Sequence, residues 1–127
     1  MPVREATPSD VDHYRSLQLA SLIEEHEVGG SHVLPTGRSV QHYLDYFLSY
    51  TQGSRFGVCL LWTPEGQTSP KGFTLIGEPW EVPSYDTDLG RVLQFWDIYI
   101  EPQWRREHGT GELYLAGFAW PGARDFD

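Results

Sequence analysis

Apolar residues recur at helical spacing in two segments of the N-terminal half of the chain. The first segment lies between residues 11 and 23, and the second lies between residues 43 and 50. Each segment places its apolar residues on one side of a helix, so that this side can pack against a sheet. Polar residues at positions 7–10 and Ser39 are candidate N-caps for the two helices. The apolar positions are Val11, Tyr14, Leu17, Leu19, Leu22, Ile23, Tyr43, Leu44, Phe47, Leu48 and Tyr50.

Shorter apolar or alternating runs predict strands. A Thr-Pro-Glu-Gly turn at residues 63–66 separates two of these runs and predicts a hairpin. A short apolar helix is predicted over residues 113–119, and Pro121 ends it. The order of elements predicts an α/β fold, built on a mixed α+β sheet with helices beside it. The predicted strands cover residues 3–6, 55–62, 70–76 and 91–101.

The length of 127 residues predicts a single domain, residues 1–127, with enough apolar material for a core. Nine basic and eighteen acidic residues give a formal net charge of -9. This charge argues against sequence-independent binding to nucleic acid, which needs Lys and Arg to replace phosphate counterions. It would suit a cationic partner, and a simple gain in solubility explains it as well. Because we find neither a signal-peptide pattern nor a membrane-length apolar segment, we expect a cytoplasmic protein with no membrane partner.

Several side chains of reactive types also have a structural explanation. Cys59 lies in an apolar run, so we expect a buried core residue rather than a nucleophile. His26 and His32 lie near a Gly-Gly pair that is typical of a loop, and we expect no metal there. Trp80 and Tyr85 lie in an acidic, Pro-containing loop and could line a site, but we expect them to cover the core.

The stretch from residue 96 to residue 111 predicts a strand, a turn and the start of a helix. Pro102 ends the strand, because proline cannot donate to a sheet ladder. Arg105, Arg106, Gly109 and Gly111 follow in the turn. The unpaired amides and the dipole at the start of a helix favour an anion, and glycines let a ligand approach the backbone. We therefore predict a phosphate site at this junction.

The last strand carries the other candidate groups. Its residues alternate between two faces, one of which is apolar. The predicted faces are Phe95, Asp97, Tyr99 and Glu101 on one side, and Trp96, Ile98 and Ile100 on the other.

At these residues the sequence resembles the GNAT superfamily of acyl-CoA N-acyltransferases. The core motif of that family is a strand that ends in an aliphatic residue, any residue and proline, followed by R/Q-x-x-G-x-G/A. Here residues 100–102 are Ile-Glu-Pro, and residues 106–111 are Arg-Glu-His-Gly-Thr-Gly. Residues 3–10 are similar to the opening strand and the first helix cap of the family. The resemblance covers nearly the whole chain and implies a GNAT-like central sheet.

The resemblance implies that acetyl-CoA binds here as a cosubstrate, without a metal. The backbone of Ile98 and Ile100 would pair with the pantetheine arm, and the following loop would hold the pyrophosphate. Asp97, with Glu101 as the second candidate, would take a proton from a primary amine, in a small molecule or a peptide, which attacks the thioester directly. For Asp97, a solvent-facing or paired structural acid is the alternative. The candidate residues of the loop are Arg105, Arg106, His108, Gly109, Thr110 and Gly111.

The chain departs from the family pattern in two places. One residue more than the commonest spacing separates Pro102 from Gly109, so either Arg105 or Arg106 could occupy the motif position. The strand, helix and hairpin that follow the motif helix in the family have no counterpart before Asp127. They often carry a tyrosine that protonates the leaving thiolate. We therefore expect a C-terminally short sheet that lacks the usual C-terminal strands, with its edge covered in a homodimer or a swapped assembly.

Two other functions remain open from the sequence. The GNAT-like fold could serve as a non-catalytic CoA-binding or protein-interaction domain. Alternatively, a small acidic binding protein could use Trp80 and Tyr85 with no CoA at all.

Overall fold

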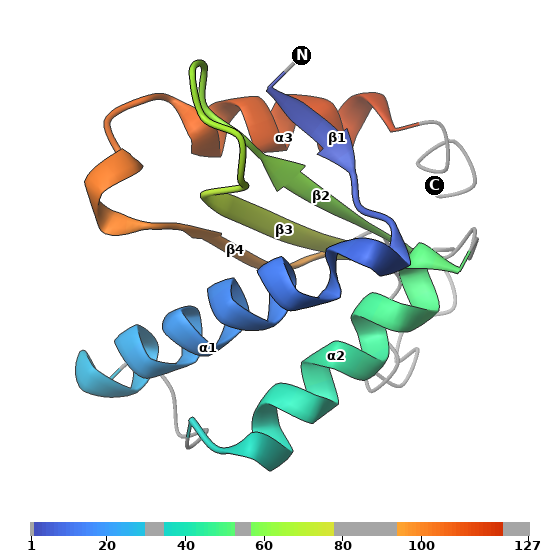
Figure 1. Ribbon diagram of the computed structural model, residues 1–127, viewed down its shortest axis with the longest axis vertical. Coiled ribbons are helices and arrows are strands. Elements are labelled where there is room, and N and C mark those ends of the chain that lie inside the picture. The colour runs from blue at the N-terminus through green and yellow to red at the C-terminus, as the bar shows by residue number, and fades with distance from the viewer. Residues whose placement is uncertain (1, 30–34, 53–56, 78–93, 121–127) are drawn as a thin grey trace, which may run out of the picture.

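The centre of the protein is an antiparallel four-stranded sheet in the computed structural model, which describes residues 2–29, 35–52, 57–77 and 94–120. Its strands lie in the order β1 (Val3–Glu5), β2 (Gly57–Trp62), β3 (Gly72–Gly77) and β4 (Gln94–Ile100). Helices α1 (Val11–Glu27) and α2 (Gly37–Thr51) cover one face of the sheet, and α3 (Gly109–Ala119) covers the other (Figure 1). The predicted α/β class, with a central sheet flanked by helices, is confirmed.

Every pairing among the described strands is antiparallel. Between β1 and β2 the chain passes through α1 and α2, which run in opposite directions (Figure 1). The second helix returns the chain to the end of the sheet where β1 finishes, so β2 runs back beside β1. Between β2 and β3 the predicted hairpin is confirmed, with Trp62 opposite Gly72.

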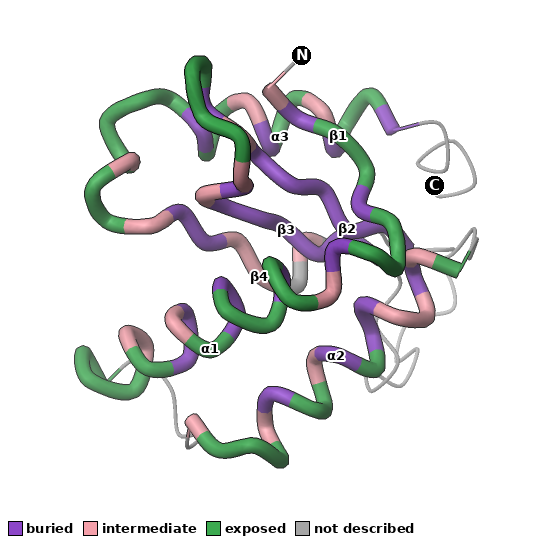
Figure 2. The backbone as a smooth tube through the Cα atoms, viewed as in Figure 1, coloured by how far each residue is buried: buried purple, intermediate pink, exposed green. Residues whose placement is uncertain are grey.

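Strands β2 and β3 are buried along their whole length (Figure 2). Their side chains alternate between two cores, one on each face of the sheet. Cys59 and Leu61 belong to the core under α1 and α2, whereas Leu60 and Trp62 belong to the core under α3. Such burial on both sides explains why β2 is a continuous apolar run rather than an alternating one. Cys59 is 1% exposed, which confirms the prediction that it is a core residue.

Strand β4 contains a β-bulge at Trp96. The register pairs Leu75 with Asp97 and Ile76 with Phe95, so two residues of β3 face three of β4. Phe95 therefore packs in the core under α3, on the opposite face from Asp97, which contacts α1. The predicted alternation placed these two residues on one face and is wrong here, because a bulge shifts the period of two by one residue.

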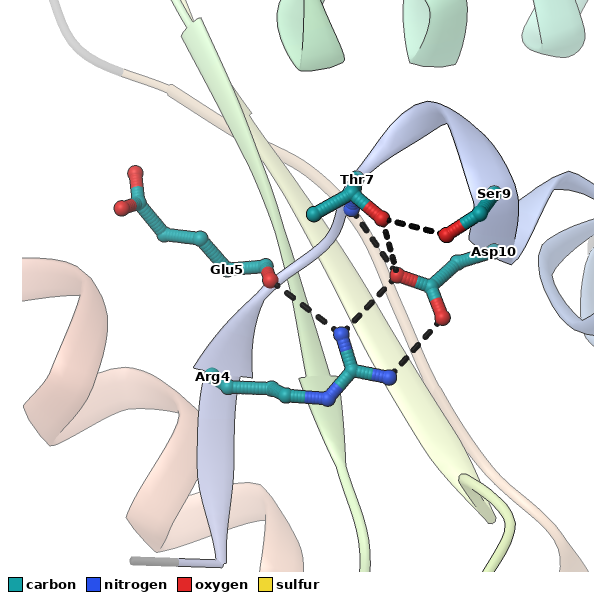
Figure 3. A network of polar contacts seen from close by, with 5 residues as sticks. All are labelled: Arg4, Glu5, Thr7, Ser9 and Asp10. Atoms are coloured by element: carbon teal, nitrogen blue, oxygen red, sulfur yellow. Dashed lines mark hydrogen bonds and ion pairs between the residues drawn. The ribbon is translucent and has the colours of Figure 1, made fainter.

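A buried carboxylate joins the end of β1 to the start of α1 (Figure 3). The two terminal nitrogens of Arg4 donate to the two carboxylate oxygens of Asp10 at 2.9 and 2.8 Å, and the Thr7 N–H donates at 2.8 Å. The Arg4 guanidinium lowers the pKa of Asp10 to about 2, because it stabilises the charged form. These contacts fix the direction in which α1 leaves the sheet, and α1 forms one side of the site described below.

The helix limits differ from the predicted ones, and α3 begins at Gly109 rather than at residue 113. Helix α1 continues to Glu27, so His26 is helical rather than part of a loop. Helix α2 has Thr36 as its N-cap, and Ser39, the predicted cap, is the third helical residue, whose N–H donates to the Thr36 hydroxyl at 3.3 Å. His32 and the loop that holds Trp80 and Tyr85 lie outside the described residues.

Candidate functional site

A cavity of about 360 Å³ lies where the end of α1, strand β4 and the start of α3 meet. It brings together four residues of the predicted site, Ile98, Ile100, Arg105 and Thr110. Its lining also includes the last turns of α1, which the sequence did not indicate. The residues that line it on this side are Ser21, Glu24 and Glu25 of α1 and Val28, the C-cap that follows the helix.

The outer edge of β4 offers backbone hydrogen-bonding groups beside this cavity. The Glu101 N–H donates to the Lys71 carbonyl at 2.9 Å, on the side of β3. Backbone groups of successive strand residues point to opposite edges of the strand, so those of Ile98 and Ile100 point away from β3. In the described sheet β4 is the outer strand. The two residues predicted to pair with a pantetheine arm therefore present their backbone at an edge.

Arg105 binds within the protein rather than extending from it. Its guanidinium forms a two-point ion pair with the Glu24 carboxylate, and its Nε donates to the Ile100 carbonyl at 2.9 Å. The guanidinium also lies 5.6 Å from the centre of the Tyr99 ring. The same contact with Arg105 lowers the pKa of Glu24. Arg106, by contrast, is exposed, and its side chain makes no ion pair or hydrogen bond with other described residues.

The start of α3 presents backbone amides beside this loop. His108 has φ 64°, a left-handed conformation that turns the chain into the helix. The first intrahelical bond runs from the Glu112 N–H to the His108 carbonyl at 3.1 Å, so the amides of Gly109, Thr110 and Gly111 precede it. An amide run that begins with a left-handed residue is a typical anion-binding feature.

The two glycines of the motif have different structural reasons. A Cβ on Gly109 would lie 2.7 Å from the Trp62 ring, so this glycine lets α3 pack on β2. A Cβ on Gly111 would meet nothing within 4 Å. Packing therefore explains the first glycine, whereas the second leaves open space over an exposed part of the backbone.

Asp97 comes directly before Ile98 on β4 and lies beside the cavity, and its carboxylate contacts the buried side of α1. It is only partly exposed, and Gln18 Nε2 donates to its Oδ2 at 3.0 Å. Burial raises the pKa of Asp97 to about 6, the Gln18 hydrogen bond opposes this rise, and the charge of Glu25 adds to it. Asp97 itself does not line the cavity, but Ile98 and Tyr99 beside it do.

Glu101, the second candidate base, lies away from the cavity. It follows the last residue of β4, and its carboxylate accepts a hydrogen bond from Gln103 Nε2 at 3.3 Å. Glu101 lies four positions after Asp97 along an extended chain, which is a separation of about 13 Å. The two acids therefore do not form one site, and Asp97 is the better placed of the two.

The sequence also did not indicate two buried residues of α1 that lie behind Asp97. Gln18 and Tyr14 are fully buried, and the Tyr14 hydroxyl donates to Gln18 Oε1 at 2.6 Å. The available signal was a polar residue in the buried stripe, because Gln18 follows Tyr14 at the helical spacing of four. Glu24 gave no comparable signal, since its partner Arg105 is 81 residues away.

Other kinds of site receive no support within the part of the chain that the structure describes. No group of three or more His, Cys, Asp or Glu residues there could hold a metal ion. A larger cavity, of about 620 Å³, lies near the turn between β2 and β3, is lined by Glu65, Glu107 and Glu112 among others, and contains no predicted site residue. No described helix combines the length and the apolar character needed to cross a membrane.

The fold is similar to that of solved acetyltransferases, which confirms the GNAT-like central sheet that the sequence resemblance implies. A protein from Bacillus halodurans matches 100% of this chain and 78% of its own, with TM-score 0.71 and 14% identity. The aminoglycoside N-acetyltransferase AAC(6')-Iy, bound to a bisubstrate analogue that contains CoA, matches 96% of this chain and 71% of its own, with TM-score 0.64 and 15% identity. An acetyltransferase from Vibrio fischeri matches 98% of this chain and 89% of its own, with TM-score 0.62 and 18% identity. No family model and no curated protein matches the sequence itself.

Proposed function

We propose that the protein transfers the acetyl group of acetyl-CoA to a primary amine by direct attack of the amine on the thioester. The observation that carries this proposal is the cavity in which the edge of β4 and the start of α3 meet, with Asp97 beside it. Solved proteins of the same fold support it, because AAC(6')-Iy is known with CoA and with a bisubstrate analogue. The residue roles below belong to the proposal.

The groups around the cavity suit the parts of acetyl-CoA. The amides of Gly109, Thr110 and Gly111 lie at a helix start and can donate to pyrophosphate oxygens, and the exposed Arg106 can add a charged donor. The open space over Gly111 leaves room for a phosphate against the backbone. The Ile98 carbonyl and the Ile100 N–H can pair with the pantetheine amides, whereas the Ile98 N–H already acts on the Asp97 carboxylate and the Ile100 carbonyl already binds Arg105.

Asp97 is the proposed base. A carboxylate with a pKa of about 6 is ionised at neutral pH, yet it accepts a proton more readily than an exposed aspartate does. It takes a proton from the ammonium form of the acceptor, directly or through water. The amine nitrogen then forms a bond to the acetyl carbon, and the carbon–sulfur bond breaks as the CoA thiolate leaves. A further proton from the new amide nitrogen neutralises the thiolate, directly or through solvent.

The charge beside the cavity favours a cationic acceptor, in a small molecule or a peptide. Glu25 lines the cavity and acts electrostatically on Asp97, while the charge of Glu24 is balanced by Arg105. An uncompensated carboxylate beside the base attracts an ammonium group. AAC(6')-Iy, which acts on aminoglycosides by its name, is one solved protein of this fold with an amine acceptor.

A second copy of the chain would cover the part of the β4 edge that pantetheine does not use. The bulge at Trp96 divides β4, so that Ile98 and Ile100 lie on one side of it and Gln94 lies on the other. A bulge bends its strand, so the two parts of the edge diverge. An exposed strand edge favours pairing with another chain. Light scattering should therefore give a dimer mass, and a monomer mass at the concentration of the activity assay would exclude this assembly.

We expect the protein to act in the cytoplasm.

A thiol-release assay tests the function. The protein is mixed with acetyl-CoA and a panel of mono- and polycationic amines, and free CoA is followed with a thiol reagent while mass spectrometry detects the acetylated amine. We expect release that depends on the amine, loss of release in Asp97→Asn, and retention in the control Asp45→Asn on the exposed side of α2. Saturable acetyl-CoA binding without release for any amine would favour a non-catalytic CoA-binding domain.

A further inference from the structure

A line of hydrogen bonds connects the interior of α1 to the acid on β4. The Tyr14 hydroxyl donates to Gln18 Oε1 at 2.6 Å, and Gln18 Nε2 donates to Asp97 Oδ2 at 3.0 Å. Tyr14 and Gln18 are both 0% exposed. The side-chain amide of Gln18 therefore connects the buried face of α1 to the carboxylate of Asp97.

A side-chain amide at this buried position costs folding free energy. Burying an amide lowers stability unless both its oxygen and its nitrogen find partners. The neighbouring positions on this face of α1, Leu17 and Leu22, carry the aliphatic residues that such a core favours. Gln18 therefore calls for an explanation other than packing, and its two partners supply one.

Tyr14 determines which end of the amide faces Asp97. The Gln18 oxygen can only accept and its nitrogen can only donate. With the Tyr14 hydroxyl donating to the oxygen, the NH₂ group is directed at the carboxylate. The Tyr43 carbonyl, at 3.4 Å, is a longer alternative acceptor for the same hydroxyl, so the bond to Gln18 is the favoured one.

We propose that Gln18, oriented by Tyr14, is a positioning residue that fixes Oδ2 of Asp97 against α1 and leaves Oδ1 to receive the proton of the acceptor. Among the residues that the structure describes, the ionisable groups that act on Asp97 are Glu25 and Tyr14, both on α1. Its nearest residues on β3, Thr74 and Leu75, do not titrate. Gln18 is thus the uncharged side-chain donor that, together with the backbone N–H of Ile98, offsets the effects of burial and of Glu25 on this carboxylate.

The test measures the titration of Asp97 directly, by carbon-13 NMR of the side-chain carboxyl in the protein without ligands. Removing a hydrogen bond to a charged group changes an equilibrium by about tenfold, so Gln18→Leu should raise the pKa of Asp97 from about 6 to about 7. Tyr14→Phe, which keeps the ring that stacks on Phe47 at 4.5 Å, should give a smaller rise in the same direction. Gln41→Leu, at an exposed glutamine of α2 that donates to Asp45, is the matched control and should change nothing.

The kinetic part of the test rests on the proposed function, whereas the NMR part does not. In Gln18→Leu the acid limb of the pH profile of kcat/KM should move upward with the measured pKa, and the rate at pH 9 should approach that of the natural protein. Activity with an unchanged Asp97 titration in both variants would overturn the positioning role and leave the proposed function standing. A shifted titration without activity in the natural protein would do the reverse. If Gln18→Leu fails to fold, the Tyr14→Phe titration decides alone.

Discussion

The carboxylate of Glu24, near the end of α1, holds the guanidinium of Arg105, which follows β4, at two points. This ion pair lies in the wall of the cavity and connects the helix to the loop after the strand. The hydrogen bond from Arg105 Nε to the Ile100 carbonyl fixes the arginine to the end of β4. Arg105 is therefore occupied by the protein itself. Of the two candidate arginines in this loop, Arg106 is the one whose side chain makes no ion pair with another described residue.

Replacing Arg106 by alanine should weaken acetyl-CoA binding by about tenfold or more, because a charged donor to phosphate is lost. Arg105→Ala should instead lower the melting temperature and change the affinity less. Arg38→Ala, at an exposed arginine of α2, is the control. Calorimetry measures all three. A loss of affinity in Arg105→Ala with none in Arg106→Ala would assign the phosphate to Arg105.

Gly111→Ala should separate ligand binding from folding. A Cβ there meets nothing in the protein, so the free energy of unfolding should stay the same or rise by up to about 1 kcal/mol. If a phosphate lies against this backbone, acetyl-CoA affinity should fall by about tenfold. Gly37→Ala, at the start of α2 and equally unobstructed, is the matched control. Equal affinities in Gly111→Ala and the natural protein would remove Gly111 from the site.

Asp10 should make stability depend on pH in acid. Its pKa of about 2 lies below the ordinary value, so its contribution is present above about pH 4 and is lost as the pH falls toward 2. Asp10→Asn should lower the free energy of unfolding at pH 7 by about 1 to 2 kcal/mol, a modest value because Arg4 is half exposed. Asp12→Asn, whose ion pair with Arg15 is exposed, should change stability little. Urea titrations at pH 7 and pH 2.5 measure the difference, and an equal loss for both variants would contradict it.

The ionisation of Asp97 should change the free energy of unfolding in the opposite direction to that of Asp10. Its raised pKa means that ionising it destabilises the fold as the pH rises from about 4 through about 6. Asp97→Asn, which can still accept from Gln18, should therefore raise the free energy of unfolding at pH 7 by about 1 to 3 kcal/mol. The same change should lower kcat by at least about a hundredfold, since the base is removed. A variant that is less stable and fully active would show that Asp97 is only a structural acid.

Local patterns made much of the fold predictable, and long-range contacts account for the rest. The helical spacing around Tyr14 and the apolar run around Cys59 depend on burial, which the sequence pattern records directly. The bulge at Trp96 could not be predicted, because the alternation of residue types along the sequence does not show where an extra residue enters the strand. The pairing of Arg105 with Glu24 depends on how α1 lies over β4, which neither local sequence contains.

The candidate site divides in the same way. The strand, turn and helix start that the motif predicts are present, because proline and glycine act on their own backbone. The motif did not indicate the contribution of α1, since Gln18 and Glu25 reach the site only through tertiary packing. A buried polar residue on an apolar helix face, such as Gln18, is the pattern that would have indicated it.

The most direct test of the central claim is a calorimetric titration of acetyl-CoA into the protein. We predict saturable binding at one site per chain, with the affinity reduced in Arg106→Ala and in Gly111→Ala but not in Arg38→Ala. The absence of binding at millimolar acetyl-CoA would contradict the claim that the cavity between α1, β4 and α3 is an acyl-CoA site.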